Sequence, residues 1–167
     1  MPVWTIYNIA ENKFIKNGCL FITEEKYQKL KAYSVDEGDV LISRAGTVGK
    51  MCVVNSIDYP SIISTNLIRL SLNPSKIEAL YFTSLMTYFK CKIGRLKTGE
   101  DGAYTFMNTG ILNDLRIPLP PFELQRSFTK IVEQVEKIKK PQQQSALEIN
   151  NLFDALVQKT FSGELVL

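Results

Sequence analysis

The feature that most constrains the fold of this chain is a proline-rich segment, Ile117-Pro118-Leu119-Pro120-Pro121. Proline fixes φ and has no N–H to donate, so three prolines within four residues fit neither a helix interior nor a central strand. We therefore expect a rigid elbow that divides the 167-residue chain into a globular domain, residues 1 to 120, and an arm, residues 121 to 167. This length accommodates one compact core with an appendage.

The arm carries two apolar stripes at helical spacing. The residues of the first stripe recur at intervals of 4, 3, 4 and 3, which is the heptad pattern of a coiled coil: Leu124, Phe128, Ile131, Val135 and Ile138. The second stripe consists of Ile149, Leu152, Phe153, Leu156 and Val157. It ends at Ser162-Gly163, where glycine is a common helix stop.

Pro141 lies between the two stripes. A proline there removes a backbone donor and crowds the preceding turn, so we expect the arm to kink or to restart, giving two helical stretches. An amphipathic helix usually packs onto its own domain, but the elbow and the heptad spacing favour pairing between chains or with a partner subunit.

The first 120 residues mix strand and helix patterns, so the expected fold class is α+β, with mixed strands and helices followed by a long helical, coiled-coil arm. The expected strands are Val3 to Ile9, Val40 to Ser43, Met51 to Val54 and Asn66 to Leu72. The expected helices are Thr23 to Leu30, with Thr23 as N-cap, and Ile77 to Ile93, which Pro74-Ser75 opens and Gly94 closes.

The chain contains no histidine. This removes the commonest general base and the commonest metal ligand, and it excludes Ser-His and Cys-His nucleophile mechanisms. Glu100-Asp101 is an adjacent acidic pair in a Gly-rich loop rather than a pair of carboxylates placed for acid–base work. We therefore expect a non-catalytic chain with no cofactor and no metal.

Cysteine spacing, net charge and hydropathy indicate the cellular environment that we expect for this protein. Cys19, Cys52 and Cys91 are odd in number and widely spaced, so we expect reduced, mostly buried thiols. The net charge is +3, and residues 1 to 120 hold all of the excess, with 14 Lys and Arg against 11 Asp and Glu. No run is long and apolar enough to cross a membrane, so we expect a cytoplasmic protein without membrane contact.

A Gly-rich segment, Gly38 to Lys50, resembles a phosphate-binding loop after a strand. It fails as an ATP site, because Arg44 stands where a glycine is needed and Met51 stands where a hydroxyl residue should follow the lysine. What remains is a tight turn that presents Arg44, Thr47 and Lys50 at the end of a strand, where glycines allow close approach of another polymer. An ordinary turn between strands is the alternative.

A basic cluster without acids precedes a polar loop. It contains Lys90, Lys92, Arg95 and Lys97, and the loop runs from Thr98 to Asn108. Such a cluster can neutralise phosphates, and the loop carries the donors and acceptors that base reading needs. A solvated helix end, with cations near the C-terminal dipole, is the alternative.

Three stretches resemble a known family, the specificity subunits of type I restriction-modification systems. The strand and Gly-rich turn within Gly38 to Lys50 are similar to those of its target-recognition domains. Ile117 to Pro121 with Gln125-Arg126 resembles the entry into the family's long central-region helix, and Phe161 to Leu165 is similar to the end of that helix. The resemblance covers essentially the whole chain.

The resemblance implies that residues 1 to 120 form a target-recognition domain that reads double-stranded DNA, and that residues 121 to 167 form a dimerisation and docking arm. It implies an antiparallel coiled coil, with a DNA methyltransferase (modification) subunit docked beside it and a restriction subunit in the full complex. Family members carry two recognition domains and two helices. This chain therefore resembles a homodimeric half-subunit, with an N-terminally truncated recognition domain, that reads an inverted repeat.

The candidate residues follow from these patterns. The expected DNA contacts are Arg44, Thr47, Lys50, Lys92, Arg95, Lys97, Thr98 and Tyr104. The expected dimer or partner interface consists of Leu124, Phe128, Ile131, Val135, Ile138, Ile149, Leu152 and Leu156. The alternative function is a protein-interaction module, or a remnant specificity subunit, that assembles through its arm without binding DNA.

Overall fold

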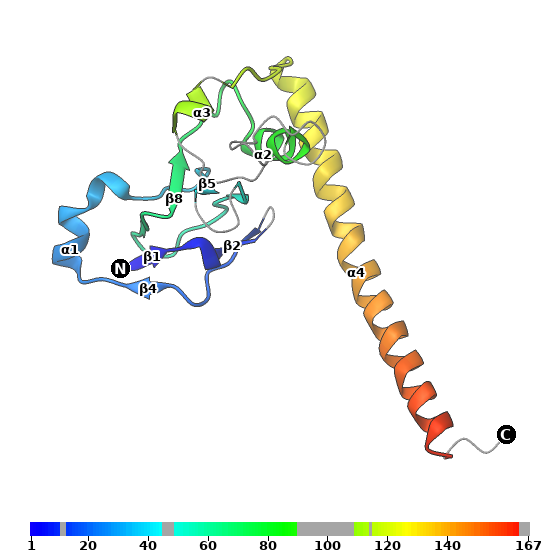
Figure 1. Ribbon diagram of the computed structural model, residues 1–167. Coiled ribbons are helices and arrows are strands. Elements are labelled where there is room, and N and C mark those ends of the chain that lie inside the picture. Colours follow the sequence, from blue (N-terminus) through cyan, green and yellow to red (C-terminus); the bar gives the residue numbers. More distant parts are fainter. Residues whose placement is uncertain (11–12, 45–48, 90–108, 114, 164–167) are drawn as a thin grey trace, which may run out of the picture. The chain divides into compact units, whose positions relative to one another are not determined.

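The computed structural model describes residues 1–167 except 11–12, 45–48, 90–108, 114 and 164–167 (Figure 1). The chain divides into two compact units, Met1–Arg126 and Ser127–Leu167. A long helix, α4 (Phe122–Phe161), begins within the last residues of the first unit and forms the second. The predicted fold class, an α+β domain followed by a long helical arm, is confirmed.

The first unit consists of short elements. Its strands are β1 (Pro2–Trp4), β2 (Ile9–Ala10), β3 (Lys13–Phe14), β4 (Leu20–Phe21), β5 (Val40–Ser43), β6 (Met51–Val53), β7 (Ile62–Ile63) and β8 (Leu67–Leu70). Its helices are α1 (Glu24–Lys29), α2 (Ala79–Tyr88) and α3 (Thr109–Asn113), with 3-10 turns η1 (Ile6–Asn8) and η2 (Lys31–Tyr33). The strands form three small sheets, in the orders β4-β1-β7, β2-β3 and β6-β5-β8.

The sheet β6-β5-β8 is the centre of the first unit. Both of its pairings are antiparallel, and Ile42 of β5 lies opposite Met51 on one side and Ile68 on the other. All four residues of β5 are buried. Successive side chains of a strand point to opposite faces, so a fully buried strand requires cover on both faces.

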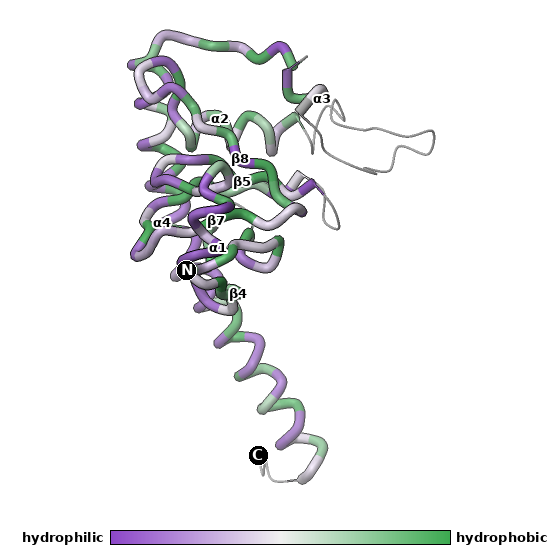
Figure 2. The backbone as a smooth tube through the Cα atoms, turned by 90° about the vertical axis from the view of Figure 1, so that its left-hand side faces the viewer, coloured by the Kyte–Doolittle hydropathy of each residue, from purple (hydrophilic) through white to green (hydrophobic). Residues whose placement is uncertain are grey.

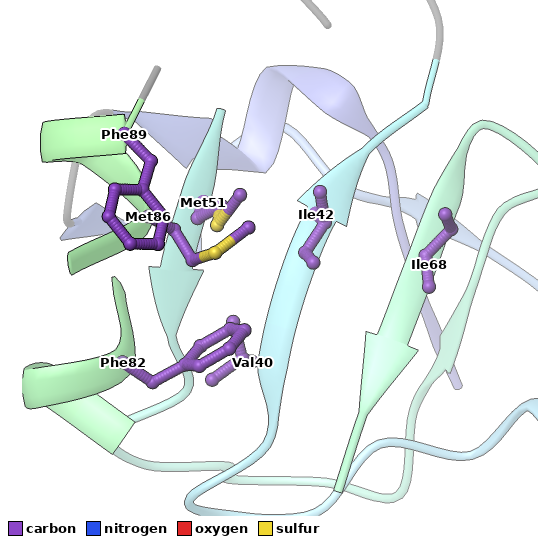
Figure 3. Close-up of a cluster of buried hydrophobic side chains, with 7 residues drawn as sticks. All are labelled: Val40, Ile42, Met51, Ile68, Phe82, Met86 and Phe89. Carbon is purple, nitrogen blue, oxygen red and sulfur yellow. The ribbon is translucent and has the colours of Figure 1, made fainter. Parts of the chain in front are cut away.

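Helix α2 covers one face of this sheet. Figure 3 shows Phe82 and Met86 of α2 beside Val40 and Ile42 of β5 in one buried cluster, which also contains Met51, Ile68 and Phe89. The opposite face packs a second cluster: Trp4, Ile9, Val35, Leu41, Cys52, Val54 and Leu67. Each buried aliphatic or aromatic side chain of this size contributes roughly 1.5–3 kcal/mol to folding, so these two clusters hold the domain together.

The predicted strand from Val3 to Ile9 is wrong in its middle. Thr5 begins a 3-10 turn with a capping box, in which the Thr5 side chain accepts from the Tyr7 N–H and the Asn8 side chain accepts from the Thr5 N–H. Asn8 is fully buried, and its amide donates to the carbonyls of Ile15 and Asn17. A polar side chain that satisfies local backbone groups competes with strand pairing, which explains the interruption.

The remaining strand and helix predictions hold with shifted ends. Thr23 caps α1 as predicted, since its side chain accepts from the Lys26 N–H at 3.3 Å. The second predicted helix starts later than expected, because the Asn73 side chain accepts from the Ser75 N–H and residues 74–76 form a turn. Helix α2 therefore begins at Ala79 rather than Ile77, and the predicted end near Ile93 lies outside the described residues.

The arm is one helix, not two stretches. α4 contains 40 residues and continues through Pro141, and in Figure 2 apolar residues recur along it between polar ones. The prediction that the helix restarts at Pro141 is therefore wrong, whereas the alternative of a kink stays a prediction. The proline leaves the carbonyl of Lys137 without its helical donor, but both residues are exposed, so water can hydrate that carbonyl. The predicted stop is confirmed, because α4 ends at Phe161 and Gly163 adopts a positive φ of 74°.

Replacing the helical proline tests this account of the arm. Pro141→Ala restores one backbone hydrogen bond and relieves the crowding, so the free energy of unfolding of α4 should rise by up to about 3 kcal/mol. Thermal unfolding followed by far-UV circular dichroism measures the change. Gln143→Ala, at another exposed helical position, is the control and should shift the transition little. An equal or lower stability of Pro141→Ala would contradict an unbroken helix.

Candidate DNA interface and the proline elbow

The loop between β5 and β6 is fixed at its base by Ser43 and Lys50. The Ser43 N–H donates to the Lys50 carbonyl at 2.9 Å, and the Lys50 N–H donates to Ser43 Oγ at 3.0 Å. The Gly49 N–H donates to the Ser43 carbonyl at 2.9 Å, and Gly49 adopts a positive φ of 76°. Residues other than glycine adopt this φ at a cost, so the glycine is required by the closure of the turn.

Two of the predicted DNA-contacting residues therefore lie at the same end of the central sheet. Arg44 is exposed, and its N–H donates to the Asn66 carbonyl at 3.0 Å, which holds its backbone beside the start of β8. Lys50 is half-buried directly across the hairpin base. Thr47 lies outside the described residues. A rigid backbone with cationic side chains at a loop base can meet the phosphates of a polyanion.

The second predicted group lies wholly outside the described residues. It contains Lys92, Arg95, Lys97, Thr98 and Tyr104. Their contact with DNA stays a prediction.

The eight predicted interface residues are all exposed on α4. Their exposed fractions run from 40% at Phe128 to 66% at Ile149, and the set is completed by Leu124, Ile131, Val135, Ile138, Leu152 and Leu156. Large exposed apolar side chains in two such rows are unusual on a protein surface, and their role as an interface stays a prediction.

Gln125 lies in the first turn of α4 and is only 1% exposed, and the sequence did not predict its role. Its Oε1 accepts from the Glu78 N–H at 3.0 Å, at the N-terminus of α2. Its Nε2 donates to the carbonyls of Lys76 at 3.1 Å and Pro120 at 2.9 Å. One amide therefore satisfies three backbone groups from two segments that lie far apart in the sequence.

Two further contacts fix the elbow within the first unit. The Tyr81 hydroxyl donates to the Pro118 carbonyl at 2.9 Å, and Arg126 lies 4.0 Å from the Glu78 carboxylate. Proline-rich backbone has few donors of its own, so side chains supply the partners for its carbonyls. The family resemblance included Gln125 and Arg126, but the sequence alone does not show what they contact.

Asp39 is the most buried acid among the described residues, and it has a structural role. Its Oδ2 accepts from the Asp36 N–H at 2.9 Å, and its Oδ1 accepts from Ser71 Oγ at 2.6 Å. Arg69 lies 3.8 Å away and donates to the Ser34 carbonyl. These bonds engage both oxygens of a carboxylate that is 4% exposed, and they tie it to the backbone of a turn and to Ser71.

The two described cysteines are free thiols, as predicted. Burial raises the pKa of Cys52 to about 12, so its thiol stays neutral at physiological pH and is a poor nucleophile. Within the described ranges, no group of three or more histidine, cysteine or acidic residues is placed to hold a metal ion. In the same ranges, no helix is long and apolar enough to span a bilayer.

A mixed α+β domain followed by a long helix with exposed apolar stripes does not by itself define a function, because one fold hosts many functions. Comparison with known proteins gives the family. The model of the type I restriction modification DNA specificity domain matches residues 2–149, and the chain belongs to this family. The resemblance found in the sequence is confirmed.

Individual relatives agree with this assignment. The putative type I restriction enzyme MjaX specificity subunit of Methanocaldococcus jannaschii is 26% identical over 141 residues, 82% of this chain and 33% of that subunit. The MjaVIII specificity subunit of the same organism is 24% identical, over 80% of this chain and 32% of its own length. The Escherichia coli EcoBI specificity subunit is 24% identical, over 86% and 31%.

A solved structure shows the same fold. One chain of a type I R-M system, from work on its complex assembly and conformational transition, has a TM-score of 0.65 and 23% identity to this chain. The likeness covers 99% of this chain and 39% of that chain. The chain thus spans about a third of the length of the curated relatives that it matches.

Loss of the Gln125 amide should destabilise the first unit. Gln125→Leu keeps the size of the side chain but leaves the Glu78 N–H and two carbonyls without their partner, so the free energy of unfolding should fall by about 2–4 kcal/mol. Urea unfolding followed by the fluorescence of Trp4, the single tryptophan, measures this change. Gln28→Leu, at an exposed position of α1, is the matched control. Equal stabilities of the two variants would show that these bonds are not required.

Proposed function

We propose that the chain is a non-catalytic, sequence-specific recognition subunit for double-stranded DNA. It directs a type I restriction-modification methyltransferase, and the restriction subunit that accompanies it, to a DNA site. It acts as a homodimeric half-subunit, in which residues 1 to 120 recognise DNA and residues 121 to 167 form the dimerisation and docking arm.

The observation that carries the proposal is the position of Arg44 and Lys50 at the hydrogen-bonded base of the loop between β5 and β6, in a chain of the DNA specificity family. Their backbones are held by hydrogen bonds, so ordering them on DNA costs little further conformational entropy. Cations fixed in this way neutralise phosphates and set the orientation of the protein on the duplex. We include Thr47 between them as a third contact.

We assign base reading to the second predicted group. Lys92, Arg95 and Lys97 supply phosphate contacts, and the loop from Thr98 to Tyr104 carries the polar groups that can meet base edges. Replacement of a lysine here would weaken binding to every sequence, whereas changes in the loop would alter which sequence is preferred.

The exposed stripe of α4 favours a second candidate, a module that assembles with another protein through its arm and does not bind DNA. The stripe is common to both candidates. Duplex binding that weakens with salt separates them, because only the first candidate releases counterions from DNA.

Charge removal at the loop base tests the proposed DNA interface. In Arg44→Gln/Lys50→Gln, each chain loses two phosphate contacts, so the slope of log K against log salt concentration should become shallower by about 2 for each chain bound, and affinity at low salt should fall at least ~10-fold. Fluorescence anisotropy with a mixed-sequence duplex at several salt concentrations measures both quantities.

The control is Lys26→Gln/Lys31→Gln, which also removes two positive charges, from exposed positions on α1 and η2. It should leave the slope unchanged. An unchanged slope in the double variant would exclude Arg44 and Lys50 from the interface. A parent chain that binds no duplex even at low salt would support the module without DNA binding.

A further inference from the structure

Because α4 is continuous through Pro141, its two apolar stripes belong to one heptad register. The intervals of 4 and 3 run on from Ile138 to Ile149 through Gln142 and Ser145, and then to Leu152 and Leu156. The stripe is therefore a single seam, defined here as residues 131, 135, 138, 142, 145, 149, 152 and 156. It is apolar at both ends and polar at its two central positions.

The seam is symmetric about the point between Gln143 and Gln144. At equal distances from this point lie Gln142 and Ser145, then Ile138 and Ile149, then Val135 and Leu152, then Ile131 and Leu156. The six apolar members are exposed by 46% to 66%. In an antiparallel coiled coil, residues at equal distances from the two-fold axis face each other across the two helices.

We propose that two copies of the chain pair antiparallel through α4, with the two-fold axis between residues 143 and 144, and that Gln142 of one copy faces Ser145 of the other. The inference rests on the homodimer of the proposed function, takes the antiparallel orientation from the family resemblance, and adds the register and the polar pair at its centre. The Gln142 amide and the Ser145 hydroxyl each contain a donor and an acceptor, so they can hydrogen-bond across the seam. Within residues 131 to 156, every layer other than this polar one is apolar on both sides.

A shift of one heptad costs free energy. It places Gln142 opposite Ile138 and Ser145 opposite Val135, so four polar side chains per dimer lose their water without gaining a hydrogen bond. Among antiparallel registers, only the one centred between residues 143 and 144 brings the polar positions together. A buried polar pair of this kind is a known determinant of register.

Residues that flank the seam favour the same arrangement. In the proposed register Val132 of one helix lies beside Phe153 of the other, which extends the apolar contact, and Lys139 lies beside Ala146. The shifted register instead brings the two copies of Lys139 together, where like charges repel. A parallel pair would place Phe153, which is 65% exposed, beside Glu148.

Cross-linking with paired cysteines distinguishes these registers. Among antiparallel registers, Ile138→Cys/Ile149→Cys places thiols opposite each other only in the proposed one, and Ile131→Cys/Ile149→Cys does so only after the one-heptad shift. Within one chain the two cysteines are 11 residues apart in the first variant and 18 in the second, about 16 Å and about 27 Å along the helix, so a disulfide must join two copies. A parallel dimer would cross-link both variants, so Ile149→Cys alone serves to detect it.

The experiment uses the full chain in a glutathione redox buffer, and mass spectrometry of the linked peptides separates the introduced cysteines from the native ones. Analytical ultracentrifugation of the parent chain and of each reduced variant is done first, to establish association. We expect the parent chain to be a dimer and Ile138→Cys/Ile149→Cys to form disulfide-linked dimers. We expect no cross-link in Ile131→Cys/Ile149→Cys or in Ile149→Cys alone.

The outcomes separate this inference from the proposed function. Cross-linking of the Ile131→Cys/Ile149→Cys variant or of Ile149→Cys alone would overturn the register or the orientation and leave the homodimer intact. A parent chain that stays monomeric at its highest soluble concentration would overturn the homodimer and this inference together, and would indicate that a different protein covers the seam.

Discussion

The first unit depends on one buried amide. The elbow is rich in prolines, which give the segment carbonyls without matching donors, and the N-terminus of α2 presents backbone N–H groups with no helical acceptor. The Gln125 side chain provides both kinds of partner, since it donates to the carbonyls of Pro120 and Lys76 and accepts from the Glu78 N–H. The first turn of α4 therefore belongs to the recognition domain, which explains why the first compact unit ends at Arg126 and not at the prolines.

Strong local patterns in the sequence predicted the elements with the clearest physical basis. The buried strand at Val40 to Ser43 and the helix capped by Thr23 were predicted, because a run of aliphatic residues and a capping hydroxyl act locally. The strands β3, β4 and β7 were not predicted. Each has two residues, too few for an alternating pattern, and each exists because tertiary contacts bring its partner strand alongside.

The errors have definite causes. Asn8 interrupts a predicted strand because its side chain satisfies a local turn, and propensity alone does not reveal this contact. Pro141 was expected to kink the arm or to begin a second helix. The helix continues through it, because an exposed helix can hydrate the one carbonyl that proline leaves without a donor. Of the candidate site, Arg44 and Lys50 come together as the hairpin predicts, whereas the contacts of Gln125 link positions 47 and 49 residues apart and leave no local signal.

The account assigns two tasks to two parts of one chain: a fixed cationic loop base that meets DNA, and an apolar helix that joins two copies. The measurement that tests this most directly is co-expression of the chain with its modification subunit, followed by mapping of methylated bases across a random DNA library. The account predicts methylation at a split inverted repeat, because two identical domains related by a two-fold axis read the same half-site in opposite directions. No methylation above that of the modification subunit alone would contradict it.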